Sequence, residues 1–276
     1  MIIWLASYPK SGNTWVRAII SSLIYSKDGL FNFKFLPNIS QFPLTEHFKD
    51  LTEDLDDLNN IKKFWVEAQE KINLNNQINF FKTHHMNCKI DGDVFTNKNN
   101  TLATIYIVRD PRNLVTSLSN HYTLTNQESK NFLLSQNNLR GKNNYDKLPV
   151  FLGTWQQHYK SWTTNNHNLL LIKYENLISD TENEIIKIIK FLKKFTDLNY
   201  EKNKIQNIIE STSFESLKKM EKENKFKENI NNELTGNKVN FFNMGKKNNW
   251  KDLLDRKLSL EIEERLNAEM KELGYL

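Results

Sequence analysis

The sequence lacks the features that mark several classes of protein. It has one cysteine, Cys88, in 276 residues, so it forms no internal disulfide and no cysteine-cluster metal site, and a reducing compartment is favoured. No apolar run approaches the roughly 20 residues that span a bilayer. The N-terminal stretch "MIIWLASYPK" has neither the basic flank nor the apolar length of a secretory signal. We therefore expect a cytoplasmic protein without a transmembrane segment.

Linkers and internal repeats are also absent. No stretch rich in Pro, Gly or Ser divides the chain, and 38% of its residues are hydrophobic, which is enough for one large core. We therefore predict a single domain over residues 1–276. The 38 Lys and Arg exceed the 33 Asp and Glu by only five. Because the chain is also rich in Asn and Ile, whose codons like those of Lys are A/T-rich, this mild basicity does not indicate a nucleic-acid partner.

Short apolar runs alternate with segments of helical periodicity. The run at 102–110 is almost wholly apolar, which is typical of a central strand in a parallel sheet. The alternation predicts an α/β fold with three layers, α/β/α, and a mostly parallel central sheet. The expected strands are 2–7, 78–85, 102–110 and 168–175, and the expected helices start at Asn13, 61, Pro111, Pro149, near Thr181, near Thr212 and at Ser259.

Three segments have no clear periodicity: 28–60, 123–148 and 225–249. We interpret 123–148, which is polar and rich in Asn, as a mobile loop or lid. The phenylalanines of 28–60 are interpreted as local core, and Trp155 and Trp162, seven residues apart, as a buried helix face.

A strand, a tight turn and a helix meet in "ASYPKSGNTWVRAI" (6–19). Lys10, Ser11, Gly12, Asn13 and Thr14 place a cation, two hydroxyls, a carboxamide and bare backbone in one turn at a helix N-terminus. This set of donors suits one tetrahedral anion. The nucleoside-triphosphate loop G-x-x-x-x-G-K-[ST] is not matched, because Asn13 occupies its lysine position. The alternative is an ordinary tight connection between strand and helix.

The stretch "FFKTHH" ends a second strand. Lys82 and His84 are two residues apart, so their side chains point to the same face. A general base beside a cation would have this form; so would a strand-end histidine in a satisfied hydrogen bond. His85 should point to the opposite side.

A third cluster lies in "YIVRDPRNLVTSLSNHY". Arg109 leaves the carboxyl end of the apolar strand, where ligands bind in open α/β sheets, and Ser117 lies two helical turns further on. The pair suits a second phosphate site. The alternative is that Arg109 pairs with Asp110 or another carboxylate.

Taken together, these motifs resemble those of the cytosolic-type sulfotransferases, which use 3′-phosphoadenosine 5′-phosphosulfate (PAPS) as sulfuryl donor. The family's Y-P-K-S-G-x-x-W is matched in full by residues 8–15, its K-T-H by residues 82–84, and its second phosphate signature by "IYIVRDPRNLVTS". Later matches are "YENL", "STSFESLKKM" and "FFNMGKKNNWK" (241–251). They follow the family's order from residue 4 to about 251, so the resemblance covers nearly the whole chain.

The resemblance implies roles for the catalytic residues. Lys10 would contact the bridging and leaving oxygens of the phosphosulfate, Lys82 the sulfuryl oxygens, and His84 would deprotonate the acceptor. Ser117 would hold Lys10 away from the donor until the acceptor binds.

The resemblance also implies the donor site. Its loop would hold the 5′-phosphosulfate and Trp15 the adenine, while Arg109 and Ser117 would bind the 3′-phosphate. The implied donor-binding set is Lys10, Ser11, Gly12, Asn13, Thr14, Trp15, Arg109, Ser117, Tyr174, Thr212, Phe214, Phe242, Asn243, Met244 and Gly245.

The closing segment departs from the family pattern. Asn243-Met244-Gly245 stands where the family has Arg-Lys-Gly, and Asn248-Asn249 where it has Gly-Asp. We expect backbone amides around Gly245, with Lys246 or Lys247, to take over the 3′-phosphate contact. The lost arginine contact is worth on the order of 1–3 kcal/mol.

We therefore predict transfer of a sulfuryl group from PAPS to a hydroxyl or amine, with release of adenosine 3′,5′-bisphosphate (PAP). A sulfuryl group carries one negative charge against the two of a terminal phosphoryl group, and no strand is followed by a clear metal-holding aspartate, so no metal is expected. The acceptor is expected to be a small molecule or glycolipid. The family's short C-terminal dimerisation pattern is absent from the sequence. The alternatives are a catalytically impaired nucleotide- or glycan-binding protein on the same fold and a P-loop nucleotide kinase, which would need a lysine at Asn13.

Overall fold

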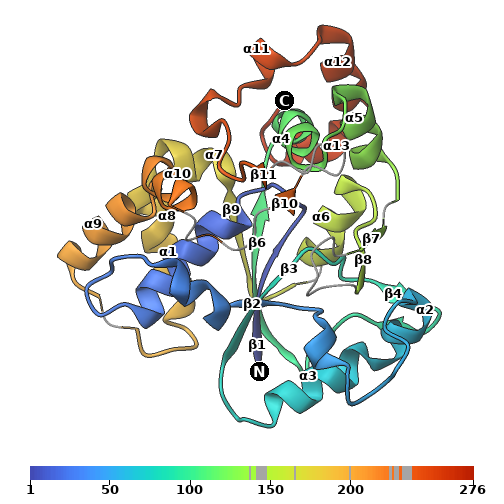
Figure 1. Cartoon of the computed structure of the whole chain (residues 1–276), viewed down its shortest axis with the longest axis vertical. Coiled ribbons are helices and arrows are strands. Elements are labelled where there is room, and N and C mark those ends of the chain that lie inside the picture. Colours follow the sequence, from blue (N-terminus) through green and yellow to red (C-terminus); the bar gives the residue numbers. More distant parts are fainter. Residues whose placement is uncertain are drawn as a thin grey trace. The chain divides into compact units, whose positions relative to one another are not determined.

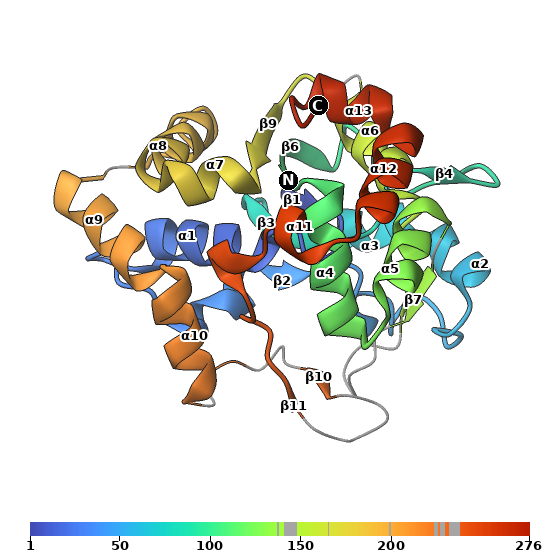
Figure 2. The ribbon, with the colours of Figure 1, turned by 90° about the horizontal axis from the view of Figure 1, so that it is seen from above.

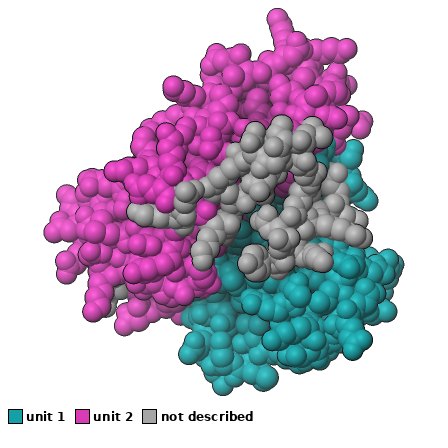
Figure 3. All heavy atoms as spheres, in the orientation of Figure 1, with its two compact units in different colours: residues 1–9, 39–108, 132–171 teal, residues 10–38, 109–131, 172–276 magenta. Residues whose placement is uncertain are grey.

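The computed structural model describes residues 1–136, 138–140, 148–164, 166–198, 200–223, 226, 230–231 and 238–276. The chain forms two compact units, coloured separately in Figure 3. Unit 1 comprises residues 1–9, 39–108 and 132–171, and unit 2 comprises residues 10–38, 109–131 and 172–276. Each unit is therefore assembled from three separate segments of the chain.

A five-stranded sheet has the strand order β2-β3-β1-β6-β9 (Figure 1). The pairs β2–β3, β3–β1 and β1–β6 are parallel, and every residue of β1 is buried. Four strands lie in unit 1, and the fifth begins in unit 1 and ends in unit 2. The strands are β1 (Ile2–Ser7), β2 (Ser40–Gln41), β3 (Asn79–Thr83), β6 (Thr101–Val108) and β9 (Leu169–Lys173). The predicted parallel sheet with 102–110 as an inner strand is confirmed.

Helix α6 (Trp155–Thr163) packs on one face of this sheet within unit 1. The Trp162 ring lies 6.0 Å from Trp4 of β1, and His158 lies 5.7 Å from Tyr106 of β6, centroid to centroid. Trp155 and Trp162 are buried, as predicted. Unit 1 also contains α2 (Leu58–Ile61), η2 (Thr45–His47), η3 (Lys62–Phe64), α3 (Trp65–Asn73) and the strand pairs β4 (Lys89–Ile90) with β5 (Asp93–Val94) and β7 (Asn138–Arg140) with β8 (Pro149–Phe151).

Unit 2 is mostly helical. Helix α1 (Asn13–Tyr25) packs against η1 (Phe33–Asn38) and against α9 (Lys202–Ser211); Figure 2 shows α1 beside α9. The other elements of unit 2 are α4 (Pro111–Tyr122), α5 (Asn126–Leu134, whose last residues belong to unit 1), α7 (Tyr174–Ser179), α8 (Thr181–Leu192), α10 (Phe214–Lys222), β10 (Ile230–Asn231), β11 (Lys238–Val239), η4 (Gly245–Lys247), α11 (Trp250–Leu253), α12 (Arg256–Arg265) and α13 (Asn267–Glu272).

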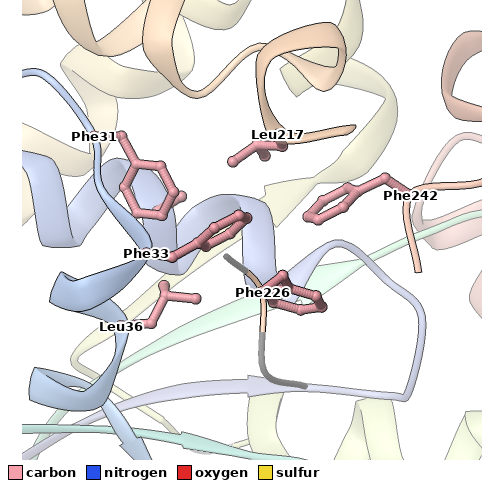
Figure 4. Close-up of a cluster of buried hydrophobic side chains, with 7 residues drawn as sticks. Phe31, Phe33, Leu36, Leu217, Phe226 and Phe242 are labelled. Carbon is pink, nitrogen blue, oxygen red and sulfur yellow. The ribbon is translucent and has the colours of Figure 1, made fainter. Parts of the chain in front are cut away.

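A buried apolar cluster joins distant segments of unit 2 (Figure 4). Phe31 and Phe33 contribute to it, which confirms that they are local core rather than surface residues. The cluster consists of Ala18, Phe31, Phe33, Leu36, Leu217, Phe226 and Phe242, with Trp15, Phe214, Met220 and Phe241 packed against it. Six of these eleven side chains belong to the motifs predicted to bind the donor, so these motifs rest on a packed core: Trp15, Phe214, Leu217, Met220, Phe241 and Phe242.

Two predicted segments are wrong in the region 123–151. Residues 126–134 form helix α5 rather than a loop, because Thr125 and Glu128 cap each other's backbone N–H groups and Leu133 is buried. Residues 137 and 141–147 of the predicted lid lie outside the described residues. Pro149 begins strand β8, and the helix starts only at Trp155, after the capping residue Thr154.

Several helix ends also differ from the predictions. The helices expected near Thr181 and near Thr212 are α8 and α10, and their capping residues are Asp180 and Ser213; both threonine hydroxyls donate to carbonyls of the preceding helix. The helix predicted at 61–72 begins at 58 with a 3-10 interruption, and the last one begins at Arg256 rather than Ser259. The short strand β2 lies in the segment 28–60, which was expected to be irregular. Among the described residues, no helix is long and apolar enough to cross a bilayer.

Candidate active site

The turn after β1 has the backbone of an anion-binding loop. Lys10 and Gly12 have positive φ angles, 67° and 104°, and the Gly12 carbonyl accepts hydrogen bonds from the N–H groups of Trp15 and Val16 at 3.0 and 3.2 Å. A Cβ on Gly12 would lie 2.6 Å from a ring carbon of Tyr174, so glycine is required here. The first N–H groups of α1 have no partner within the helix and carry a partial positive charge.

Two cations of unit 2 lie on aromatic rings beside this turn. The Lys10 Nζ is 3.6 Å from the centroid of the Phe241 ring, and the Arg109 guanidinium is 4.2 Å from that of Tyr174. Arg109 Nη1 also donates to the Lys10 carbonyl at 3.1 Å. Four predicted or neighbouring positions, separated by up to 231 residues in the chain, thus come together around the loop. Because the rings orient both side chains, each cation is held beside the turn that follows β1.

The loop and its neighbours contain buried hydrogen-bonding atoms without a partner among the described residues. These are Ser11 Oγ, Trp15 Nε1 and Arg109 Nε. A buried donor that makes no hydrogen bond costs about 1–3 kcal/mol, so such atoms usually have a partner. An anionic nucleotide would supply acceptors for them. The residues present therefore fit a phosphate-bearing donor.

The residues that follow Arg109 and Tyr174 in the chain make a second pair of contacts. The Asp110 N–H donates to Glu175 Oε1 at 3.0 Å, and the Tyr275 hydroxyl donates to Glu175 Oε2 at 2.9 Å. Burial and the neighbouring Glu175 raise the pKa of Tyr275 well above its ordinary value, so it is a neutral donor. The residues Arg109 and Asp110 are consecutive, as are Tyr174 and Glu175. The backbone of the stack is therefore fixed by the C-terminal tail.

The carboxylate of Asp110 pairs with Arg112 rather than with Arg109. Arg112 Nη2 lies 2.7 Å from Asp110 Oδ2, and its guanidinium lies 3.9 Å above the Trp250 ring. Burial opposes the charge, but the carboxylates of Asp110 and Glu263 outweigh burial and raise the pKa of Arg112. This arrangement answers the question left open by the sequence, because Arg109 keeps its charge available for a ligand.

The closing segment is positioned by buried contacts within unit 2. Both oxygens of Glu221, which is 3% exposed, accept from the backbone N–H groups of Phe241 and Phe242 at 2.7 and 3.0 Å. Gly245 has φ 55°, and a Cβ there would lie 2.8 Å from the Phe214 ring. The predicted residues Phe214, Phe242 and Gly245 are therefore in one cluster.

Three lysines lie in or beside this segment. Lys246 and Lys247 are exposed, whereas half-buried Lys218 of α10 donates from Nζ to the Asn243 carbonyl at 2.9 Å. Lys218 is not among the residues predicted from the sequence. Its signal is its spacing of four from Phe214, which puts both side chains on one face of α10.

The asparagines that replace the family's Gly-Asp have structural roles. Asn248 Nδ2 donates to the Asn113 carbonyl at 2.9 Å, and the Trp250 N–H donates to Asn113 Oδ1 at 2.8 Å. Asn249 caps α11. These bonds attach the closing segment to α4, the helix that carries half-buried Ser117. Of the remaining predicted donor residues, Asn13, Thr14 and Thr212 are buried and Asn243 and Met244 half-buried.

The predicted base and its lysine lie in unit 1. His84 directly follows β3, and its Nδ1 lies 2.8 Å from the Ser7 carbonyl at the end of β1. A carbonyl only accepts, so Nδ1 carries the proton, and Nε2 of the neutral ring has the lone pair that a general base needs. Lys82, half-buried, pairs in register with Leu5 of β1 and Gln41 of β2. The Ser7 contact was not predicted, because no sequence pattern links residues 7 and 84.

His85 has a different environment from His84. It is fully buried, its ring stacks on Phe95 at 4.3 Å, and its Nδ1 bonds the Met86 carbonyl. Burial lowers the pKa of His85 to about 3. His85 is therefore a core residue on the other side of the strand from His84, as expected because successive side chains of a strand point to opposite faces.

Among the described residues, no group of three or more His, Cys, Asp or Glu side chains is arranged to hold a metal ion.

Comparisons with known proteins agree with these motifs. The sequence model of the sulfotransferase domain matches residues 2–274. Sulfotransferase 1E1 of Mus musculus is 26% identical over 271 residues, which cover 97% of this chain and 83% of that protein. Amine sulfotransferase of Oryctolagus cuniculus is 25% identical over 278 residues, covering 98% and 81%.

Solved structures show the same fold. A mouse sulfotransferase complexed with PAP has a TM-score of 0.57 at 20% identity, covering 98% of this chain and 84% of that chain. Retinol dehydratase in complex with androsterone and PAP has a TM-score of 0.61 at 18% identity, covering 98% and 80%. The α/β/α fold with its P-loop-like turn is thereby confirmed, and the match of the domain model to nearly the whole chain contradicts the nucleotide-kinase alternative.

Proposed function

The chain belongs to the sulfotransferase family, a class of PAPS-dependent enzymes, and we propose that it transfers the sulfuryl group of PAPS to a hydroxyl or amine of a small molecule with His84 as general base. The supporting observation is the group of contacts around Lys10 and Arg109 in unit 2. Two cations on aromatic rings, and three buried donor atoms that have no partner in the described part of the chain, lie in or beside the turn that precedes α1. This is the composition expected of a site for a nucleotide with phosphates at both ends of its sugar.

PAPS supplies an activated sulfuryl group whose leaving group is PAP. In our proposal the N–H groups at the start of α1, Ser11 and Lys10 bind the 5′ end and offset the charge that grows on the leaving phosphate. Arg109, Ser117 and the backbone at 243–245 bind the 3′-phosphate, with Lys218 as the added cation. Trp15 and Phe214, both in contact with the buried cluster, flank the adenine, and Tyr174, Thr212 and Phe242 complete its surroundings.

His84 performs the proton transfer in unit 1. Its Nδ1–H donates to the Ser7 carbonyl, which directs the basic Nε2 away from β1. Nε2 takes the proton of the acceptor hydroxyl or amine as that atom attacks sulfur. Lys82, on the same face of β3 as His84, would offset charge on the sulfuryl oxygens.

The acceptor is proposed to be a small molecule. Relatives named for small-molecule substrates include an amine sulfotransferase and a luciferin sulfotransferase, and retinol dehydratase was solved with retinol and with androsterone. Transfer without a metal, a cytoplasmic location and a single domain over residues 1–276 stay part of the proposal.

The test is a transfer assay with ³⁵S-labelled PAPS and a panel of phenols, steroids, amines and glycolipids, run with and without EDTA and with ATP as a rival donor. Label should reach an acceptor from PAPS alone, in EDTA as well as without it. His84→Ala should lower kcat by about 10²-fold or more, the usual scale for loss of a general base. Near-normal turnover of that variant would remove His84 from the role.

The 3′-phosphate site has its own test. Binding of PAPS and of its 3′-dephospho form should differ by more than about tenfold, which corresponds to about 1.4 kcal/mol. A smaller difference would show that the proposed contacts from Arg109, Ser117 and the closing segment do not hold that phosphate.

A further inference from the structure

Helix α6 binds the turn that carries His84 at three points, all within unit 1. His158 Nε2 lies 3.0 Å from the His84 carbonyl, and Trp162 Nε1 donates to the His85 carbonyl at 2.9 Å. One helical turn also supplies Ser161, whose Oγ accepts from the Asn87 N–H at 3.1 Å. Residues 84–87 lie beyond the end of β3, so the sheet ladder no longer fixes their backbone. The side chains of α6 take over that function.

The polarity of the His158 contacts follows from its partners. The His84 carbonyl only accepts, so His158 Nε2 carries the proton, and Nδ1 accepts from the Tyr106 hydroxyl at 2.9 Å. His158 is fully buried, and burial lowers its pKa to about 3. The ring is therefore neutral under working conditions and has one tautomer. A hydrogen-bonded chain from Tyr106 to the His84 carbonyl results.

The ring of His158 also contacts Tyr8, the residue that follows β1. Its centroid lies 5.6 Å from that of Tyr8, in an edge-to-face arrangement at 84°. Tyr8 is two residues before Lys10 in the chain. Tyr106, the other partner of His158, pairs in register with Ala6 of β1. One buried side chain thus touches β6, the residue that follows β1 and the turn of the proposed base.

We propose that His158 is a positioning residue for His84. The inference rests on the proposed role of His84 as the base. His158 fixes the peptide group of His84, so that the ring keeps its Nδ1–H on the Ser7 carbonyl and presents Nε2 to the acceptor. Loss of the His158 donor frees this peptide group, and the His84 ring then exchanges between its two tautomers and loses its orientation.

The experiment compares substitutions at His158 that keep or remove the donor at the Nε2 position. Glutamine places an amide N–H near that position, leucine has none, and asparagine places its amide near Nδ1. His167→Leu, which removes an exposed histidine, is the matched control. Long-range ¹H–¹⁵N spectra of the protein without donor report the tautomer of His84, and steady-state kinetics report kcat apart from donor affinity.

We expect His158→Leu and His158→Asn to lower kcat by about tenfold or more, since misplacement of about 1 Å costs up to 10²-fold. In both variants the single Nδ1–H tautomer of His84 should be lost, whereas His158→Gln and His167→Leu should retain it. The donor Kd should not change, because the proposed donor residues belong to unit 2. His158→Asn serves where His158→Leu does not fold, as judged by thermal melting.

A folded Leu or Asn variant with wild-type kcat and an unchanged His84 spectrum would overturn the inference. A wild-type protein that transfers no label but shows the His158-dependent tautomer would instead contradict the proposed function while the positioning contact stands. The two failures are therefore distinguishable.

Discussion

At the scale of single residues, the proposed donor site in unit 2 contains two cations that lie on aromatic rings, Lys10 on Phe241 and Arg109 on Tyr174. Arg109 offers a planar guanidinium that stacks on Tyr174 while Nη1 bonds the Lys10 carbonyl. A lysine at this position would keep the charge but lose both the stack and the fixed fork of donors.

We therefore predict that Arg109→Lys raises the Kd for PAP by about tenfold or more, the scale of one to two kcal/mol for a desolvated cation–aromatic contact and a charged hydrogen bond. Tyr174→Phe keeps the aromatic face and should change the Kd much less than Tyr174→Leu. Calorimetric titration of PAP into the wild type and the three variants measures the Kd of each protein. Equal affinity of wild type and Arg109→Lys would contradict the assigned contact.

Gly12 provides a sharper test of the loop. Gly12→Ala combines an unfavourable φ of 104° with a Cβ placed 2.6 Å from the Tyr174 ring, whereas Gly92 has a φ of 102° with no atom within 4 Å of the added Cβ. Both substitutions add backbone strain of about 1–2 kcal/mol, so both should lower Tm. Only Gly12→Ala should also weaken PAP binding by tenfold or more, measured by titration. If Gly92→Ala weakened binding equally, the steric account of Gly12 would be wrong.

The sequence predicted the identity of these residues better than their partners. Lys10, Arg109, His84 and Tyr174 lie in motifs with a recognisable order, so their selection needed no coordinates. Phe241 under Lys10 and Ser7 beside His84 escaped prediction because a contact between residues 77 or 231 positions apart in sequence leaves no periodic signal.

At the scale of elements, the start of α7 and the C-terminal tail make hydrogen bonds to the residues next to the Arg109–Tyr174 stack. Glu175 bridges the Asp110 N–H and the Tyr275 hydroxyl, and Lys173 Nζ lies 4.5 Å from the Tyr275 ring and bonds the Leu273 carbonyl. In the proposed function, these contacts would give the last residues of the chain a role in donor binding.

We predict that Tyr275→Phe raises the KM for PAPS severalfold while kcat stays near the wild-type value. The ring remains for Lys173, but Glu175 loses the donor that orients it, and a hydrogen bond to a charged group contributes about 1.5–3 kcal/mol. Tyr200→Phe, at a tyrosine that is 36% exposed, is the control. A fall in kcat at unchanged KM would show that Tyr275 does not support donor binding.

The errors in element prediction have local physical causes. Helix α5 ("NQESKNFLL") has too few apolar residues for a clear apolar stripe, so the sequence did not predict it. It forms because Thr125 and Glu128 cap its start and Leu133 near its end is buried. Pro149 suits either the first turn of a helix or an edge strand, and here pairing with β7 decides for the strand. Strands buried on both faces, such as β1 and β6, were predicted well because a continuous apolar run has few other solutions.

At the scale of the whole molecule, buried neutral histidines make stability depend on pH. Burial lowers the pKa of His47 to about 4 and those of His85 and His158 to about 3, against about 6.5 in the unfolded chain. Between these values the unfolded chain binds more protons than the folded one. Stability is therefore full above pH 6.5 and is lost progressively as the pH falls toward 3.

At pH 5.5 each of the three histidines should lower the free energy of unfolding by about 1 kcal/mol relative to pH 7.5. Urea denaturation at the two pH values measures the difference. His158→Gln should remove about one third of it, because one of three titrating groups is gone. Equal stability of the wild type at both pH values would contradict the burial of these rings.

The proposed single domain can also be tested at this scale. The chain passes repeatedly between the two units, each of which is built from three segments, so neither unit is a continuous stretch of the sequence. We predict one unfolding transition with coincident tryptophan-fluorescence and far-UV circular dichroism curves. Two resolved transitions would show that the units unfold independently.

The most direct test of the account combines donor binding and transfer in one pair of proteins. Wild type and His84→Ala are each titrated with PAP and then assayed with ³⁵S-PAPS and the acceptor panel in EDTA. We predict equal PAP affinity, label on at least one hydroxyl or amine acceptor with the wild type, and at least about 10²-fold slower labelling with the variant. Near-equal labelling rates of the two proteins, or PAP binding by the wild type with no transfer to any acceptor, would contradict it.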